Sequence, residues 1–182
     1  MKRENPLVKQ SKQWMIKALL ELMLEKPYSD IKINELTDKA QLSRKTFYRN
    51  FKVKDDILKE YINYLFNEYL DYLKRSEIHN YSDVLIIYFT FWNKHIDILK
   101  LLKKNHLFYM VMEHETSFIP YLNDINTPWH NYSSDVDAKY LLLFCIGGLW
   151  NVLSDWIENP HRESPQNIAY ILQKNINNLK NI

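Results

Sequence analysis

The chain has 182 residues, 46% of them apolar, and its 24 Lys/Arg against 22 Asp/Glu give a net charge of +2. This is enough for one or two domains with a full core, while two glycines and six prolines argue against β-hairpins and glycine-rich phosphate loops and favour helices. The single cysteine, Cys145, excludes an internal disulfide and fits a reducing cytoplasm.

The small net charge hides an asymmetry along the chain. Residues 1–54 hold 13 Lys/Arg and 6 Asp/Glu, a net of +7, whereas residues 55–182 hold 11 and 16, a net of −5. A basic N-terminal third on an acidic remainder is typical of a nucleic-acid-binding part joined to a part that need not touch polyanions. Surface lysines are also common in any soluble protein, so charge alone leaves both interpretations open.

The first predicted helix follows a polar, basic arm of residues 1–10. Ser11 is a candidate cap, and the helix is expected to continue to about Glu25, before Pro27. Its apolar residues recur at spacings of three and four: Trp14, Met15, Ala18, Leu19, Leu22 and Met23.

Residues 33–54 predict two short helices, at about 34–40 and 44–50, separated by a tight turn and followed by the start of another helix. Ser43 is the expected cap of the second. The inward positions are Leu36, Ala40, Phe47 and Phe51, and the donors around them are Ser43, Arg44, Lys45, Thr46, Tyr48, Arg49, Lys52 and Lys54. A short helix with cations and hydroxyls on one face is what a helix-turn-helix needs to enter the major groove.

The stretch LSRKTFYRNFKVKDDIL closely resembles the TetR/AcrR family of bacterial transcriptional regulators. The similarity covers about residues 8–60, roughly a third of the chain, and Thr46-Phe47-Tyr48-x-x-Phe51-x-x-Lys54 is its specific part. Two residues depart from the family pattern. Gln41 stands where the turn usually has glycine, and Lys32 stands where Thr or Ser usually caps the helix. Because glycine is the residue that adopts a left-handed backbone at little cost, we expect a slightly strained or differently shaped turn.

Base contacts are expected from Arg44, Lys45 and Thr46, because helix-turn-helix proteins contact bases with the N-terminal residues of the recognition helix. The resemblance implies phosphate contacts for Ser43, Tyr48 and Lys54, and we add Arg49. The alternative is that Phe47 and Tyr48 are core aromatics and the cations a solvated face. For Phe47 we accept that alternative.

A fourth helix should begin near Lys54, with Asp55 and Asp56 in its first turn, and join the head (residues 1–53) to the body (residues 54–182). Its apolar stripe is Leu58, Tyr61, Ile62, Leu65, Tyr69 and Leu73. After a break at 79–82, helices are expected at 83–104 and 106–116, and a loop at 120–134.

The last two helices, predicted at about 135–158 and from Pro165 onward, suggest a dimer interface. Ser134 or Asp135 can cap the first and Ser164 the second, whose stripe is Ile168, Ile171, Leu172, Ile176 and Leu179. Two adjacent glycines cost about 2 kcal/mol of helix propensity, which a close approach by another helix would explain. The expected interface residues are Ile146, Gly147, Leu149, Trp150, Leu153, Trp156, Ile168, Ile171 and Leu172. The alternative is that this apolar helix is the core of one monomer.

A pocket for an apolar or aromatic effector is the least specific prediction. Its candidates are Phe89, Trp92, His95, Phe108, Tyr109 and Met112, with His106 and His114 as further polar anchors. An aromatic stripe at helical spacing is more often plain core. The sequences around His95 and His114 come nearest to a metal site, but their residues are not spaced so that they could bind one metal ion together. No catalytic motif is present either. We therefore expect no bound metal, no cofactor and no enzymatic activity.

The sequence therefore predicts an all-α protein with an N-terminal helix-turn-helix. The resemblance implies that it is a homodimeric repressor, released from a palindromic DNA operator by a small-molecule effector of unknown identity. No export leader is seen, and the apolar run 140–150 is shorter than the ~20 residues that span a bilayer, so we expect a cytoplasmic protein. Two alternatives remain. One is a co-activator of the same fold whose body binds a protein, and the other is a helical small-molecule-binding protein or enzyme with an incidental basic head.

Overall fold

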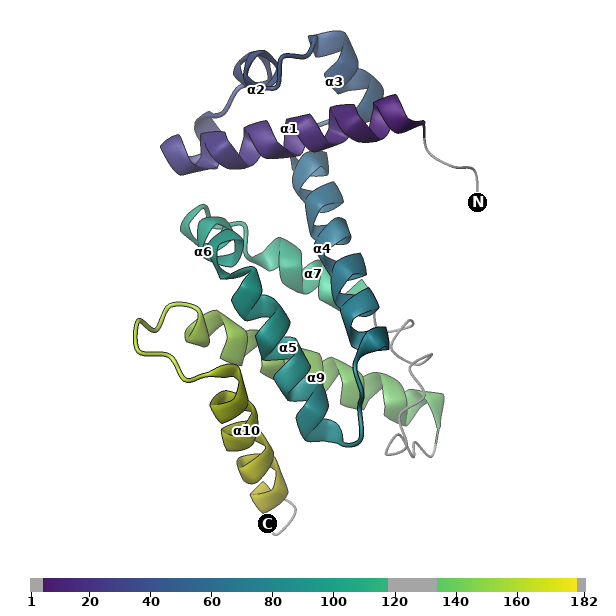
Figure 1. Cartoon of the computed structure of the whole chain (residues 1–182), viewed down its shortest axis with the longest axis vertical. Helices are drawn as coiled ribbons and strands as arrows, with labels where there is room; N and C mark the ends of the chain where they lie inside the picture. The colour runs from purple at the N-terminus through teal and green to yellow at the C-terminus, as the bar shows by residue number, and fades with distance from the viewer. Residues whose placement is uncertain (1–4, 118–133, 180–182) are drawn as a thin grey trace.

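The computed structural model describes residues 5–117 and 134–179, and this part of the chain is helical with no strand, as predicted. The helices are α1 (Pro6–Glu25), η1 (Tyr28–Asp30), α2 (Ile33–Lys39), α3 (Arg44–Asn50), α4 (Asp55–Arg75), α5 (Tyr81–Lys94), α6 (Ile96–Lys104), α7 (Tyr109–Ser117), α9 (Asp135–Trp156) and α10 (Pro165–Leu179). In Figure 1, α1 to α3 form one end of the molecule, and α4 runs from them along the body. The predicted loop at 120–134 lies, apart from Ser134, outside the described residues.

Helix α1 begins at Pro6, so the prediction of an arm that extends through residue 10 and of Ser11 as the cap is wrong. The side chain of Asn5 accepts a hydrogen bond from the Leu7 N–H at 3.0 Å, and Pro6 takes the first helical position, where its missing N–H costs nothing. Ser11 lies inside the helix, and its hydroxyl donates to the Leu7 carbonyl at 2.7 Å.

The head packs as predicted. Leu36, Ala40, Phe47 and Phe51 are all buried, and α1 contacts α2, α3 and α4. The same hydrophobic cluster continues without interruption into the body, from Met15 of α1 to Ile168 of α10. The head is therefore held on the body by shared core packing as well as by the chain.

The turn between α2 and α3 has the strain that the missing glycine predicted. Gln41 has a φ of 54°, in the left-handed region. Its N–H donates to the Asp38 carbonyl, and the Leu42 N–H donates to the Thr37 carbonyl at 2.9 Å. These two bonds form a Schellman motif, whose left-handed residue is usually glycine. Lys32, at the start of α2, makes no side-chain cap, as its departure from the family pattern implied.

We expect Gln41→Gly to raise the free energy of unfolding by about 0.5–1 kcal/mol, because glycine relieves the left-handed strain at some cost in unfolded-state entropy. Urea unfolding followed by circular dichroism measures the change. Gln10→Gly, in the interior of α1, is the control and should lower stability by about 1 kcal/mol. A loss of stability in Gln41→Gly would contradict this account of the turn.

The predicted single helix over 83–104 is wrong, because the chain breaks at His95 into α5 and α6 (Figure 1). Neither glycine nor proline marks this break. The turn in direction lets Leu99 and Leu102 of α6 become fully buried, so tertiary packing overrides local propensity. A second Schellman motif ends α6, with His106 at a φ of 59°, and α7 therefore begins at Tyr109 rather than His106.

The last two helices have the predicted caps. The Ser134 side chain accepts from the Asp137 N–H at 3.2 Å, and the Ser164 side chain accepts from the Asn167 N–H at 3.2 Å before Pro165. Helix α10 packs along α5, and α9 packs against α7. Of α9's 22 residues, Ala138, Ile146, Leu153 and Trp156 are buried.

Candidate nucleic-acid interface

Helix α3 turns one side chain into the core and leaves the rest of its surface open. Phe47 has no exposed surface, whereas Arg44, Lys45 and Arg49 are exposed and Thr46 is partly buried. Ser43 caps the helix by accepting a hydrogen bond from the Thr46 N–H at 3.1 Å, as predicted, and its Oγ lies 3.0 Å from the Thr46 hydroxyl. The cap thus fixes the first turn, which carries the three predicted base-contacting side chains.

Tyr48 lies outside the core. Its side chain is 53% exposed, and its ring packs edge-on against Phe47 with 5.1 Å between ring centroids. The buried Phe47 ring therefore orients an exposed phenol beside the cations of α3. This arrangement disfavours the alternative that Tyr48 is a core aromatic, and it leaves the hydroxyl free to donate to a phosphate.

Lys54 is tied into the molecule in a way that sequence reasoning missed. Its ammonium donates to the carbonyls of Tyr28 and Ile31, the second at 2.9 Å, and lies 4.0 Å from the centre of the Tyr28 ring. Burial lowers the pKa of Lys54. Two of its three N–H donors are used here, so a phosphate contact through the third stays a prediction.

Tyr28 joins the head to two parts of the body. Its hydroxyl donates to the Asp55 carboxylate of α4 at 2.5 Å, and its backbone N–H donates to the Asn105 side chain, at the end of α6, at 2.8 Å. Burial, together with the Asp55 carboxylate, raises the pKa of Tyr28, so the phenol stays protonated and keeps donating. We call Tyr28, Lys54, Asp55 and Asn105 the joint. Its residues are separated by up to 77 positions, and no local pattern predicts such a contact.

Asp56 closes the turn that leads from α3 into α4. Its carboxylate accepts the backbone N–H groups of Lys52 and Val53 at 2.8 and 3.0 Å. The Val53 hydrogen bond is the main cause that lowers the pKa of Asp56, and the Lys52 bond adds to it. The predicted placement of an acid in the first turn of this helix is confirmed, and the acid also acts as a cap.

We expect Asp56→Ala to lower the free energy of unfolding by about 1 kcal/mol at pH 7. Because the folded-state pKa lies below the unfolded one, this stabilisation is present above the unfolded pKa of about 3.9 and is lost as pH falls through the folded pKa. Urea unfolding of both proteins from pH 7 down to pH 3 should therefore show a shrinking difference. Asp71→Ala, an exposed acid of α4, is the control with little effect at any pH. A difference that stays constant with pH would contradict this role.

Most of the predicted interface residues of α9 and α10 lie in the core of the chain itself or pack against it. Four of them are buried in the chain's own core, and Trp150 stacks on Phe108 with 4.0 Å between centroids. The four are Ile146, Leu153, Trp156 and Ile168. Leu149 and Leu172 pack against the same core, and Ile171 is partly buried. The alternative that α9 belongs to the core of one monomer is thus supported for one face of the helix, while the dimer interface itself stays a prediction.

The opposite face of α9 is exposed and apolar, and sequence reasoning did not single it out. Tyr140, Leu141 and Phe144 are 64%, 50% and 76% exposed, and on α10 Tyr170 is 61% exposed. Apart from the adjacent residues and the backbone of α9 itself, no atom of the described chain lies within 4 Å of a Cβ built on Gly147 or Gly148. The close helix approach that we expected at the glycines is therefore not made within the described part of the molecule.

Among the described helices, α9 alone has the length and apolar composition needed to cross a membrane. This is weak evidence for a membrane span, because helices of soluble proteins pass the same test. An exposed apolar face of this kind also fits a helix that pairs with another protein surface.

The predicted effector residues are mostly core. Phe89 and Trp92 have almost no exposed surface, and Phe89 packs edge-on against Trp156 at 5.4 Å. Phe108 is also buried, whereas Tyr109 is 46% exposed and Met112 partly buried. His95 lies at the α5–α6 break, 3.7 Å from the Glu68 carboxylate, and burial lowers its pKa. No group of three potential metal-ligating residues occurs within 5–117 and 134–179. Packing thus supports the core interpretation for Phe89 and Trp92, and the pocket stays a prediction.

Comparison with known proteins agrees with this geometry. The family described as "Bacterial regulatory proteins, tetR family" matches residues 15–61, and the family described as "Transcriptional regulator C-terminal region" matches residues 90–178. A crystal structure of a TetR transcriptional regulator from Streptococcus agalactiae 2603V superposes with a TM-score of 0.64 at 18% identity, covering 92% of this chain and 94% of that one. No curated protein matched the sequence. The structure has an N-terminal helix-turn-helix and a helical body, and a family match covers most of each. The chain therefore belongs to the TetR family of bacterial transcriptional regulators.

Proposed function

We propose that this DNA-binding regulator is a cytoplasmic homodimeric repressor that a small-molecule effector releases from a near-palindromic operator. The observation that carries the proposal is the open face of α3, where three cations and the Tyr48 phenol surround one buried anchor. In a two-fold dimer, two such helices would enter successive major grooves about 34–36 Å apart. We further propose that the head (residues 1–53) and the body (residues 54–182) act as separate functional domains.

A second copy is the proposed cover of the exposed face of α9. Phe144 and Tyr140 expose most of their side chains to water. Burying them against a second copy would stabilise the dimer by about 25 cal/mol per Å² of apolar surface. The open space at Gly147 and Gly148 would let a partner helix come close, a role that the described residues of the same chain do not fill. In this arrangement the self-complementary patch is Tyr140, Leu141 and Phe144 of α9.

Base and phosphate contacts should respond differently to mutation. We expect Lys45→Ala to cost about 1–3 kcal/mol at the operator and to relax sequence preference, because a base contact is lost. Tyr48→Phe removes one phosphate donor, so it should weaken binding by a similar factor on operator and on unrelated DNA. Fluorescence anisotropy with both DNAs at one fixed salt concentration measures the two ratios. Lys100→Ala, on the exposed side of α6, is the control. If Lys45→Ala weakened both DNAs equally, Lys45 would be a phosphate contact.

Effector release requires two arrangements of the dimer with different head separations. An effector that prefers the DNA-incompetent one shifts the population through a coupling of typically about 1–3 kcal/mol. Helix α4 is the proposed lever, because it leaves the head at the joint and packs on α5 and α7. Distances between spin labels on the two heads should change with a ligand that lowers operator affinity, and a promoter–reporter fusion gives the sign of regulation. Unchanged distance and affinity with every ligand that binds would overturn this mechanism.

The alternative function is a co-activator whose body binds another protein. The exposed Tyr140, Leu141 and Phe144 would suit such a partner as well as a second copy. A chain that is monomeric alone and forms a stoichiometric complex with one purified partner through these residues would favour it.

A further inference from the structure

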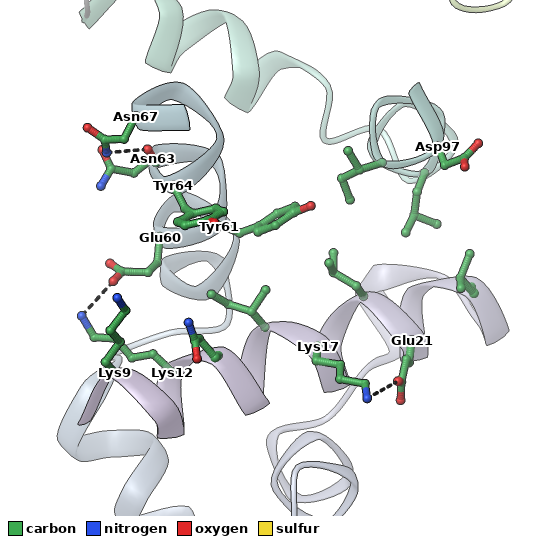
Figure 2. Close-up of a pocket in the computed structure, with 16 residues that line it drawn as sticks. Lys9, Lys12, Lys17, Glu21, Glu60, Tyr61, Asn63, Tyr64, Asn67 and Asp97 are labelled. Atoms are coloured by element: carbon green, nitrogen blue, oxygen red, sulfur yellow. Dashed lines mark hydrogen bonds and ion pairs between the residues drawn. The ribbon is translucent and has the colours of Figure 1, made fainter. Parts of the chain in front are cut away.

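A groove of about 690 Å³ lies between the head and the body, bounded by α1 on one side and by α4 and α6 on the other (Figure 2). This volume is in the range that holds small organic ligands. None of the effector residues predicted from sequence lines it. The groove is therefore a second candidate ligand site, independent of the aromatic core of the body.

The surface of the groove is largely apolar. Helix α1 contributes Ile16, Leu20 and Leu24, and α6 contributes Ile98 and Leu101 from the opposite side. Leu24 is 69% exposed, so the free protein leaves this apolar surface in contact with water. A ligand with an apolar chain or ring would remove that contact.

Charges divide the groove into two unlike ends. At one end, Lys9 and Lys12 of α1 lie together, and Lys12 is paired with Glu60 of α4 at 2.9 Å. Lys9 makes no ion pair with any residue of the described chain, which leaves this end with one uncompensated cation. Two carboxylates lie towards the other end (Figure 2): Asp97, in the first turn of α6, where it complements the helix dipole, and Glu21 of α1, which lies 3.9 Å from the Lys17 ammonium.

Tyr61 supplies a polar group between the two ends. Its ring projects from α4 into the space between α1 and α6 (Figure 2). Burial raises the pKa of Tyr61, so its hydroxyl is protonated at neutral pH and can donate a hydrogen bond. The groove is thus apolar over most of its area and has charged and polar side chains around it, a composition that can hold a small molecule with both apolar and polar parts.

We propose that this groove binds a small amphipathic anion, with its carboxylate or similar acid group at Lys9 and its apolar body against Leu20, Leu24 and Leu101. Asp97 repels the acid group at the far end, so the ligand binds in one direction. As the effector site, the groove rests on the proposed function, because that function requires a small-molecule site.

The position of the groove connects occupancy to the head. A ligand there contacts α1 of the head and α6 of the body at once. Asn105, which directly follows α6, accepts a hydrogen bond from the Tyr28 N–H of the joint at 2.8 Å. A ligand that changes the distance between α1 and α6 therefore also changes the geometry of the joint. In this way it shifts the orientation of the head relative to the body, and the buried core need not rearrange.

The test uses decanoate as the probe, below its micellar concentration, with methyl-labelled full-length protein observed by NMR. Decanoate should shift the methyl signals of Leu20, Leu24, Ile98 and Leu101, while decyltrimethylammonium, of the same chain length and opposite charge, should bind more weakly. Lys9→Glu should raise the decanoate dissociation constant about fivefold. Lys100→Glu, an equal charge change on α6 outside the groove, should leave it unchanged.

Three results would overturn the site. They are an absence of shifts, equal binding of the two charged probes, and shifts confined to the exposed methyls of Val136 and Leu141 on α9. A different result would separate the site from its role: decanoate binding in the groove without any change in operator affinity would sustain the site and refute effector release through it. Loss of operator binding on its own, with no groove shifts, would sustain effector release and refute this site.

Discussion

Phe144→Asp is expected to make the protein monomeric and to weaken operator binding by about 100-fold or more. Phe144 is 76% exposed in the single chain, on the face of α9 that carries the two glycines. In the proposed dimer its ring is buried against the second copy, where two facing aspartates would be both desolvated and mutually repelled. A monomer carries one head, so it loses the gain from binding two half-sites together.

Size-exclusion chromatography with light scattering, followed by anisotropy on the operator, measures both effects. The matched control is Tyr64→Asp, on an exposed part of α4 away from α9, where Tyr64 is 59% exposed. It should leave the mass and, without ligand, the affinity unchanged. A Phe144→Asp protein that remains dimeric with full operator affinity would show that the dimer pairs elsewhere.

Phe47→Ala is expected to cost about 3–5 kcal/mol of stability in the head. Phe47 has no exposed surface, and it packs between Tyr48 at 5.1 Å and Phe51 at 6.1 Å. Its removal leaves a cavity where α3 is anchored to α1 and α2, and it also removes the surface that orients Tyr48. DNA binding should be lost together with head stability.

Amide hydrogen exchange locates the effect, because opening free energies are obtained element by element. Protection should fall in α1 to α3 and remain in α10. Phe47→Leu keeps most of the volume and should cost about 1.5 kcal/mol or less, with DNA binding largely retained. Equal loss of protection in head and body would mean that the continuous core unfolds as one unit, and the head would then have no independent stability.

The recognition unit was predictable because its signals are local. The Ser43 cap predicts where α3 begins, and the spacing of its aromatic residues predicts that Phe47 is buried. The missing glycine predicts the left-handed backbone at Gln41. All of these residues lie within ten positions of one another. The start of α1 was equally local, since Asn5-Pro6 has the same cap-and-proline pattern that located α10 correctly.

The missed features depend on contacts between distant residues. Nothing in the residues around His95 favours a break, which exists because α6 packs across the molecule. The joint likewise links Tyr28 to Asn105. In α9, an almost uniformly apolar sequence cannot tell the face that packs inside, such as Leu153, from the face that stays exposed, such as Phe144. The groove at the head–body boundary is formed by three helices and has no sequence pattern of its own.

The most direct test of the central claim, a dimeric and sequence-specific DNA reader, is binding selection from a random double-stranded DNA pool at two salt concentrations. We expect a near-palindromic site whose half-sites are about 10 base pairs apart, with an affinity that falls steeply as salt rises because phosphate contacts release counterions. Recovery of no enriched sequence, with only weak salt-sensitive binding, would contradict the account and bring the protein-binding alternative to first place.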